Sequence, residues 1–119
     1  MINERPHKKL RVWQRAKSLV TKIYEMTNGF PAIEEFGLKS QLRRAAVSVP
    51  SNIAEGLTRR GKNDKLHFLN IAQSSLSEMD TQIEIALDLK YVRQDIYEAL
   101  ETDLVEVQSL LGGLIRSLK

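Results

Sequence analysis

Apolar residues recur at intervals of three and four along most of the chain, which is the spacing of one face of an α-helix. No stretch alternates apolar and polar residues as a half-buried strand does. The pattern divides into four segments, at about residues 10–27, 36–57, 63–89 and 94–118. The sequence therefore predicts an all-α protein built from four amphipathic helices.

Residues that favour turns and helix ends separate these segments. Asn28-Gly29 ends the first segment, and either Gly56 or Gly61 is a suitable stop for the second. Asn63 is a good N-cap for the third, because its side chain can accept a hydrogen bond from an unpaired backbone N–H. Gly112-Gly113 interrupts the fourth segment. The glycine pair either permits close packing on another helix or lets the last turns fray.

The short connections indicate that consecutive helices run antiparallel, since a short loop cannot carry the chain back along the bundle. We therefore expect an antiparallel up-down-up-down four-helix bundle over residues 10–119. Residues 1–9 are charged and lack apolar periodicity, so we expect them to form a flexible N-terminal tail.

Pro50 lies in the middle of the second segment, where apolar spacing continues in register on both sides. Proline has no N–H to donate to the carbonyl of Ala46, so the helix is expected to kink there instead of ending. Ser48, Ser51 and Asn52 flank the proline, and their short polar side chains can bond the loosened backbone groups. We read this cluster as structural in preference to a ligand site.

The residues needed for catalysis or metal binding are scarce. The chain has no cysteine and two histidines, His7 and His67, neither of which lies in a recognisable catalytic or metal-binding pattern. Acidic residues of the third segment share part of one helical face and predict a solvated or inter-subunit acidic surface; they are Glu78, Asp80, Glu84 and Asp88. We therefore expect no enzymatic activity, no cofactor and no bound metal.

Charge is unevenly distributed along the chain. Residues 1–67 carry fourteen Lys and Arg against six Asp and Glu, whereas residues 68–119 carry four against nine. Two basic clusters favour nucleic-acid binding, because Lys and Arg neutralise phosphates. The main cluster is Arg59, Arg60 and Lys62, and the secondary cluster is Lys8, Lys9 and Arg11. For the mid-helix pair Arg43 and Arg44, ion pairing with a third-helix or neighbouring-subunit carboxylate is an equally good explanation.

Three stretches together carry a family resemblance: residues 10–16, residues 36–56 with the sequence RRAAVSVPSNIAEG at 43–56, and residues 68–78. They resemble the 23S rRNA-intervening-sequence proteins of bacteria. The resemblance implies an antiparallel four-helix bundle that assembles as a homopentamer. A broad apolar arc on the first helix also favours a homo-oligomer, because it is wider than one bundle core needs.

These observations give an expectation for function. We expect a non-catalytic oligomeric protein that binds nucleic acid, RNA or DNA, through its basic clusters, acting either on structured RNA or as a partner of an RNA-handling protein. The alternative is a scaffold whose ring docks a partner protein. No apolar run reaches the ~20 residues of a membrane span. The chain has no cysteine, which suits a reducing compartment, so we expect a cytoplasmic protein.

Overall fold

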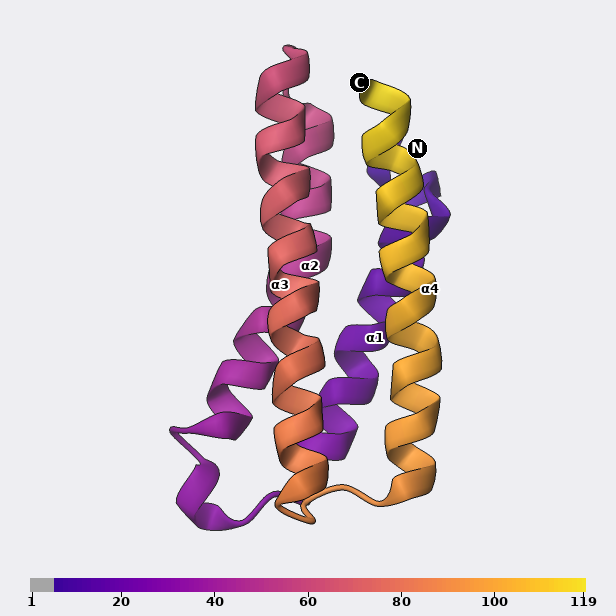
Figure 1. The fold of residues 1–119 in the computed structure, drawn as a ribbon. Coiled ribbons are helices and arrows are strands. Elements are labelled where there is room, and N and C mark those ends of the chain that lie inside the picture. The colour runs from indigo at the N-terminus through magenta and orange to yellow at the C-terminus, as the bar shows by residue number, and fades with distance from the viewer. Residues whose placement is uncertain (1–5) are drawn as a thin grey trace, which may run out of the picture.

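Four long helices make up the computed structural model, which describes residues 6–119. They are α1 (Arg11–Thr27), α2 (Leu38–Thr58), α3 (Lys62–Asp88) and α4 (Gln94–Leu118). Two short 3₁₀ helices, η1 (Pro6–Lys9) and η2 (Ala32–Glu34), precede α1 and α2. The helices run alternately up and down (Figure 1), and no strand occurs in the described part of the chain. The predicted antiparallel four-helix bundle is confirmed.

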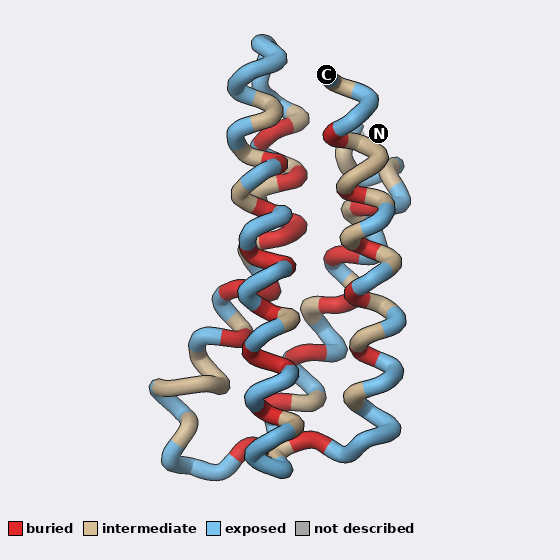
Figure 2. Tube along the Cα trace, in the orientation of Figure 1, coloured by how far each residue is buried: buried red, intermediate tan, exposed pale blue. Residues whose placement is uncertain are grey.

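Each helix packs against two neighbours, α1 against α2 and α4, and α3 against α2 and α4. Figure 2 shows that the buried positions recur on the sides of the helices that face one another. One continuous core results, whose largest fully buried side chains are Leu19, Ile23, Leu42, Ile53, Leu69, Leu76, Met79, Ile83, Leu104 and Leu111. None of the described helices has the combination of length and apolarity that spanning a membrane requires.

The start of α3 differs from the prediction. Asn63 lies inside the helix, which begins at Lys62 with Gly61 as its N-cap and no capping side-chain hydrogen bond. The Gly61 carbonyl accepts the first helical bond, from the Lys65 N–H at 3.0 Å. Gly61 takes the extended N-cap conformation, so the observed N-cap lies two residues before Asn63 and the helix begins one residue before it.

Helix α2 continues through Pro50 without interruption, so the chain has no loop there; the kink itself stays a prediction. Gly56 is not a stop, since α2 ends at Thr58. A Cβ atom at Gly56 would lie 3.1 Å from the Lys65 carbonyl oxygen and 3.2 Å from the Phe68 Cβ. Gly56 therefore allows α2 and α3 to approach closely.

Part of the predicted tail has regular structure. Residues 6–9 form η1, while residues 1–5 lie outside the described residues. The His7 ring meets Trp13 edge-on at 5.1 Å, and the Gln14 Nε2 donates to the Lys8 carbonyl at 2.9 Å. These contacts hold η1 against the first two turns of α1.

Candidate nucleic-acid interface

The predicted basic clusters lie at one end of the bundle. Both ends of the described chain and the α2–α3 turn meet there, as Figure 1 shows. We call this region the basic end and define it as residues 6–15, 59–65 and 116–119. The clusters are distant in sequence, and the alternation of helix direction brings them together.

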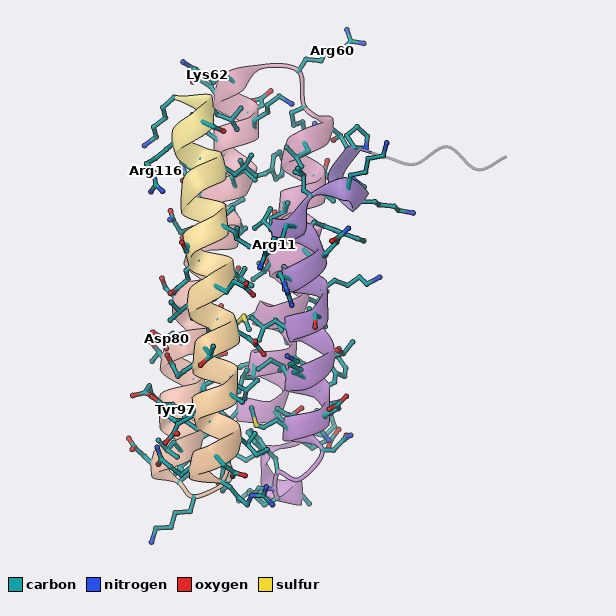
Figure 3. The ribbon with its side chains drawn as sticks, turned by 90° about the vertical axis from the view of Figure 1, so that its right-hand side faces the viewer. Arg11, Arg60, Lys62, Asp80, Tyr97 and Arg116 are labelled. Carbon is teal, nitrogen blue, oxygen red and sulfur yellow. The ribbon has the colours of Figure 1, made fainter. Side chains whose placement is uncertain are left out.

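Arg60 and Lys62 point away from the bundle at this end (Figure 3). Both are exposed, and within residues 6–119 neither side chain takes part in a hydrogen bond or an ion pair. Arg60 lies in the turn and Lys62 opens α3. Their charges are therefore available to an anionic partner.

Arg59, by contrast, is engaged within the chain. Its Nη2 lies 2.8 Å from the Glu55 Oε2, one helical turn earlier, and its guanidinium covers the Phe68 ring at 4.7 Å. The side chain is 43% exposed, so it can reach solvent, but the Glu55 carboxylate already neutralises its charge. Arg59 is consequently a weaker candidate for a phosphate contact than Arg60 or Lys62.

Arg11 is also paired. Its Nη2 lies 2.8 Å from the Oε2 of Glu106 on α4, and the Nε of Arg15 lies 3.4 Å from the other oxygen of the same carboxylate. Two arginines thus share the carboxylate of Glu106, so the three side chains together keep a net positive charge. Lys8 and Lys9 are exposed on η1, beside this group.

The C-terminal cations Arg116 and Lys119 were not among the predicted site residues. Arg116 lies at the basic end in Figure 3, and Lys119 is exposed three residues later. The Arg116 side chain folds back over Gly112-Gly113, with its Nη1 3.3 Å from the position that a Gly112 Cβ would take. No other helix of the described chain comes within 4 Å of that position, so the predicted close packing on another helix does not occur there. Helix α4 continues to Leu118.

Arg43 does not pair with a carboxylate of the third helix. Its Nε donates to the Thr27 Oγ1 at 2.8 Å, and its Nη2 donates to the Tyr24 carbonyl at 3.1 Å and the Asn28 Oδ1 at 3.0 Å. The guanidinium also lies over the Tyr24 ring at 4.3 Å. Arg43 thus caps the C-terminus of α1, whose last carbonyls have no partner in the helix.

The polar residues around Pro50 join helices. The Asn52 Nδ2 donates to the Ser48 carbonyl at 2.8 Å and to the Ser48 Oγ at 2.9 Å. The buried Ser75 of α3 donates to the Ser48 Oγ at 2.9 Å. Ser51 is exposed and takes no part in these bonds. The Asn52 bonds therefore satisfy polar groups within α2, and the Ser75–Ser48 bond ties α2 to α3.

Carboxylates meet in the seam between α3 and α4. The pKa of Glu101 is raised to about 7, mainly because the carboxyl group is partly buried. A hydrogen bond with Asp80 and repulsion from Asp80 and Glu84 raise this pKa further. Tyr97 has its pKa raised to about 12, chiefly by its hydrogen bond to Glu84. No set of three or more His, Asp or Glu side chains among residues 6–119 is arranged to hold a metal ion.

Together, these features define a four-helix-bundle protein with one basic end. The family described as 23S rRNA-intervening sequence protein matches residues 8–113. The chain belongs to this family, as the resemblance indicated.

A solved structure supports the same fold. It is the crystal structure of a protein of unknown function from the S23 ribosomal protein family of Bacteroides thetaiotaomicron VPI-5482. That protein is 24% identical to this chain, and the alignment covers 87% of this chain and 97% of that one with a TM-score of 0.81. No curated protein matches the chain. Neither the family nor this structure points to catalysis.

Proposed function

We propose that this protein is a non-catalytic, homo-oligomeric, nucleic-acid-binding protein whose basic end contacts phosphates of RNA. One observation carries the proposal: the cations of η1, the α2–α3 turn and the C-terminus lie at the same end of the bundle. Each cation that neutralises a phosphate releases condensed counterions, so a cluster of cations binds nucleic acid more tightly than scattered ones do. RNA is favoured over DNA because the family description names 23S rRNA.

The aromatic side chains near the basic end favour backbone contacts over base stacking. Trp13 is half-buried, and the Lys17 ammonium lies over its ring at 5.2 Å. The guanidinium of Arg59 covers one face of Phe68, and the His67 ring meets it edge-on. A stacked base needs an open aromatic face, so we expect little discrimination between sequences.

A homo-oligomer would repeat this basic end several times around an axis. Linked copies of a weak site bind a long partner far more tightly than a single copy does. Five copies is the number that the family resemblance implies. Half-buried Trp13, Val20 and Met26 on α1 leave apolar surface that a neighbouring copy would cover.

The test is a comparison of two double variants by fluorescence anisotropy with a structured RNA. Arg60→Gln/Lys62→Gln removes two unpaired cations from the basic end, whereas Lys90→Gln/Arg93→Gln removes two exposed cations of the α3–α4 turn, at the opposite end of the bundle. We expect the first variant to weaken binding at least tenfold in low salt and the second to change it less than threefold. Equal effects of the two variants would contradict the proposed interface.

The wild type supplies the salt control. The logarithm of its affinity should fall linearly with the logarithm of the salt concentration, with a slope of about 0.7–0.9 per phosphate neutralised. An absence of binding at low salt would refute nucleic-acid binding and favour the scaffold alternative.

A further inference from the structure

Two arginines on one face of α1 share a single carboxylate of α4. Arg11 and Arg15 are four residues apart on the helix, so their side chains project from the same side. The Arg11 Nη2 lies 2.8 Å from the Glu106 Oε2, and the Arg15 Nε lies 3.4 Å from the Glu106 Oε1. Two positive charges therefore meet one negative charge at this place between α1 and α4.

The ratio of charges separates this group from other ion pairs on the surface. Glu55 neutralises Arg59 one to one, and Asp103 does the same for Lys22. At Glu106 one positive charge remains, while the shared carboxylate holds both guanidinium groups close together. Two cations held close together repel each other, and a further anion between them relieves that repulsion.

The arginines are the more exposed partners in this group. The Arg11 and Arg15 side chains are 63% and 50% exposed, whereas the Glu106 side chain is 33% exposed. An anion that approaches from solvent can therefore reach the guanidinium groups more easily than it meets the carboxylate that opposes it.

The guanidinium groups keep most of their hydrogen-bonding capacity. Each guanidinium carries five N–H donors and no acceptor. Within residues 6–119, Arg11 donates to Glu106 through Nη2, and the Arg15 contact with Glu106 is an ion pair without a hydrogen bond. The remaining N–H groups need an acceptor from outside the chain, and the oxygens of a phosphate match the planar fork of a guanidinium.

A hollow of about 390 Å³ lies beside these guanidinium groups, and Arg11, Gln14, Arg15 and Ser18 line it. We call this hollow the α1 pocket. Ser18 is half-buried, and its hydroxyl forms no hydrogen bond within the described residues. The Gln14 Nε2 donates to the Lys8 carbonyl and so joins the rim of the pocket to η1. The lining thus offers N–H and O–H donors and contains no acidic side chain.

The α1 pocket continues the basic end along α1. Figure 3 shows Arg60 and Lys62 at the extreme end of the bundle and Arg11 further along it, on α1. Ser18 lies one turn beyond residues 6–15, which belong to the basic end. A nucleic-acid strand that contacts the end of the bundle therefore has further cations along this face of α1.

We propose that Arg11, Arg15 and Ser18 bind one backbone phosphate of RNA in the α1 pocket. N–H groups of both arginines and the Ser18 hydroxyl donate to the phosphate oxygens. The inference rests on the proposed function and deepens it, because it adds Arg15 and Ser18 to the RNA contacts and gives one phosphate a defined site.

The first test is the RNA affinity of Arg15→Gln, measured by fluorescence anisotropy over a range of salt concentrations. Arg93→Gln is the matched control, because it also removes an ion-paired arginine, at the opposite end of the bundle. We expect Arg15→Gln to weaken binding about tenfold in low salt. The slope of log affinity against log salt should fall by about 0.7–0.9, the contribution of one phosphate. The control should change neither quantity.

The second test separates a defined pocket from a diffuse effect of charge. Ser18→Ala removes a hydroxyl donor and leaves the charge unchanged, so it should weaken binding about threefold with an unaltered salt slope. Ser51→Ala is the control, since Ser51 is an exposed serine of α2 outside the pocket lining. Circular dichroism should show all four variants folded.

The outcomes distinguish the α1 pocket from the proposed function. If Arg60→Gln/Lys62→Gln weakens binding and Arg15→Gln does not, the pocket is overturned and the basic end stands. If Arg15→Gln weakens binding but Ser18→Ala behaves like Ser51→Ala, the arginines act as diffuse charge and the pocket is again overturned. Failure of the wild type to bind RNA in low salt would overturn both claims.

Discussion

The partly buried carboxyl group of Glu101 should make the free energy of unfolding depend on pH. One oxygen of its carboxyl group is buried with no hydrogen-bond partner in the described part of the chain. Its pKa rises from 4.5 to about 7, first because of burial and then because of Asp80 and Glu84. Between about pH 4.5 and pH 7, the folded protein therefore keeps a proton on Glu101 that the unfolded chain has already lost.

The consequence is a stability that depends on pH. Because the folded state binds more protons, the free energy of unfolding falls as the pH rises through this interval and levels off above it. At ~1.4 kcal/mol per pKa unit, the upper limit of the fall is roughly 3 kcal/mol. The side chain is only partly buried, so solvent screening reduces the expected fall to about 1 kcal/mol.

Glu101→Gln tests this account, since glutamine has nearly the same shape and no charge. We expect the variant to unfold at higher urea concentration than wild type at pH 8, by about 1 kcal/mol, and to match it near pH 4.5. Glu98→Gln is the control, because Glu98 is an exposed carboxylate of the same helix. If wild type and Glu101→Gln show the same pH dependence between pH 4.5 and 8, the reasoning about this site is wrong.

Three further variants test the packing and turns. Gly56→Ala should destabilise the protein by about 1 kcal/mol or more in urea unfolding, because the new Cβ would press on the Lys65 carbonyl; a stabilised variant would contradict this. Arg43→Ala should cost about 1–2 kcal/mol by removing three hydrogen bonds at the end of α1. Lys90→Gly should raise the melting temperature by a few degrees, because Lys90 has a left-handed φ of 64°.

The helices could be predicted from the sequence because the core positions alone produce the periodic pattern. Leu42, Val49 and Ile53 keep helical spacing across Pro50 and are all buried, so α2 was correctly expected to continue. The N-cap of α3 was predicted wrongly. Asn63 has the stronger capping side chain, but the turn geometry places Gly61 at the cap and gives the Asn63 side chain no such role.

Which cations form ion pairs is harder to predict from the sequence than where the helices lie. The Glu55–Arg59 pair is one turn apart on α2, so its spacing could have indicated that Arg59 is neutralised. The Arg11–Glu106 pair joins residues of α1 and α4, and it depends on how those helices are shifted along one another. No local pattern encodes that shift. Arg116 and Lys119 could have been placed at the basic end, because an up-down-up-down bundle brings the end of α4 beside the start of α1.

The most direct test of the proposed function is to map where RNA contacts the wild-type protein, by ultraviolet cross-linking and mass spectrometry of the cross-linked peptides in low salt. We predict cross-links concentrated in residues 6–15, 59–65 and 116–119, and a loss of those cross-links as salt is raised. Cross-links concentrated instead in residues 28–37 and 89–96, at the opposite end of the bundle, would contradict it.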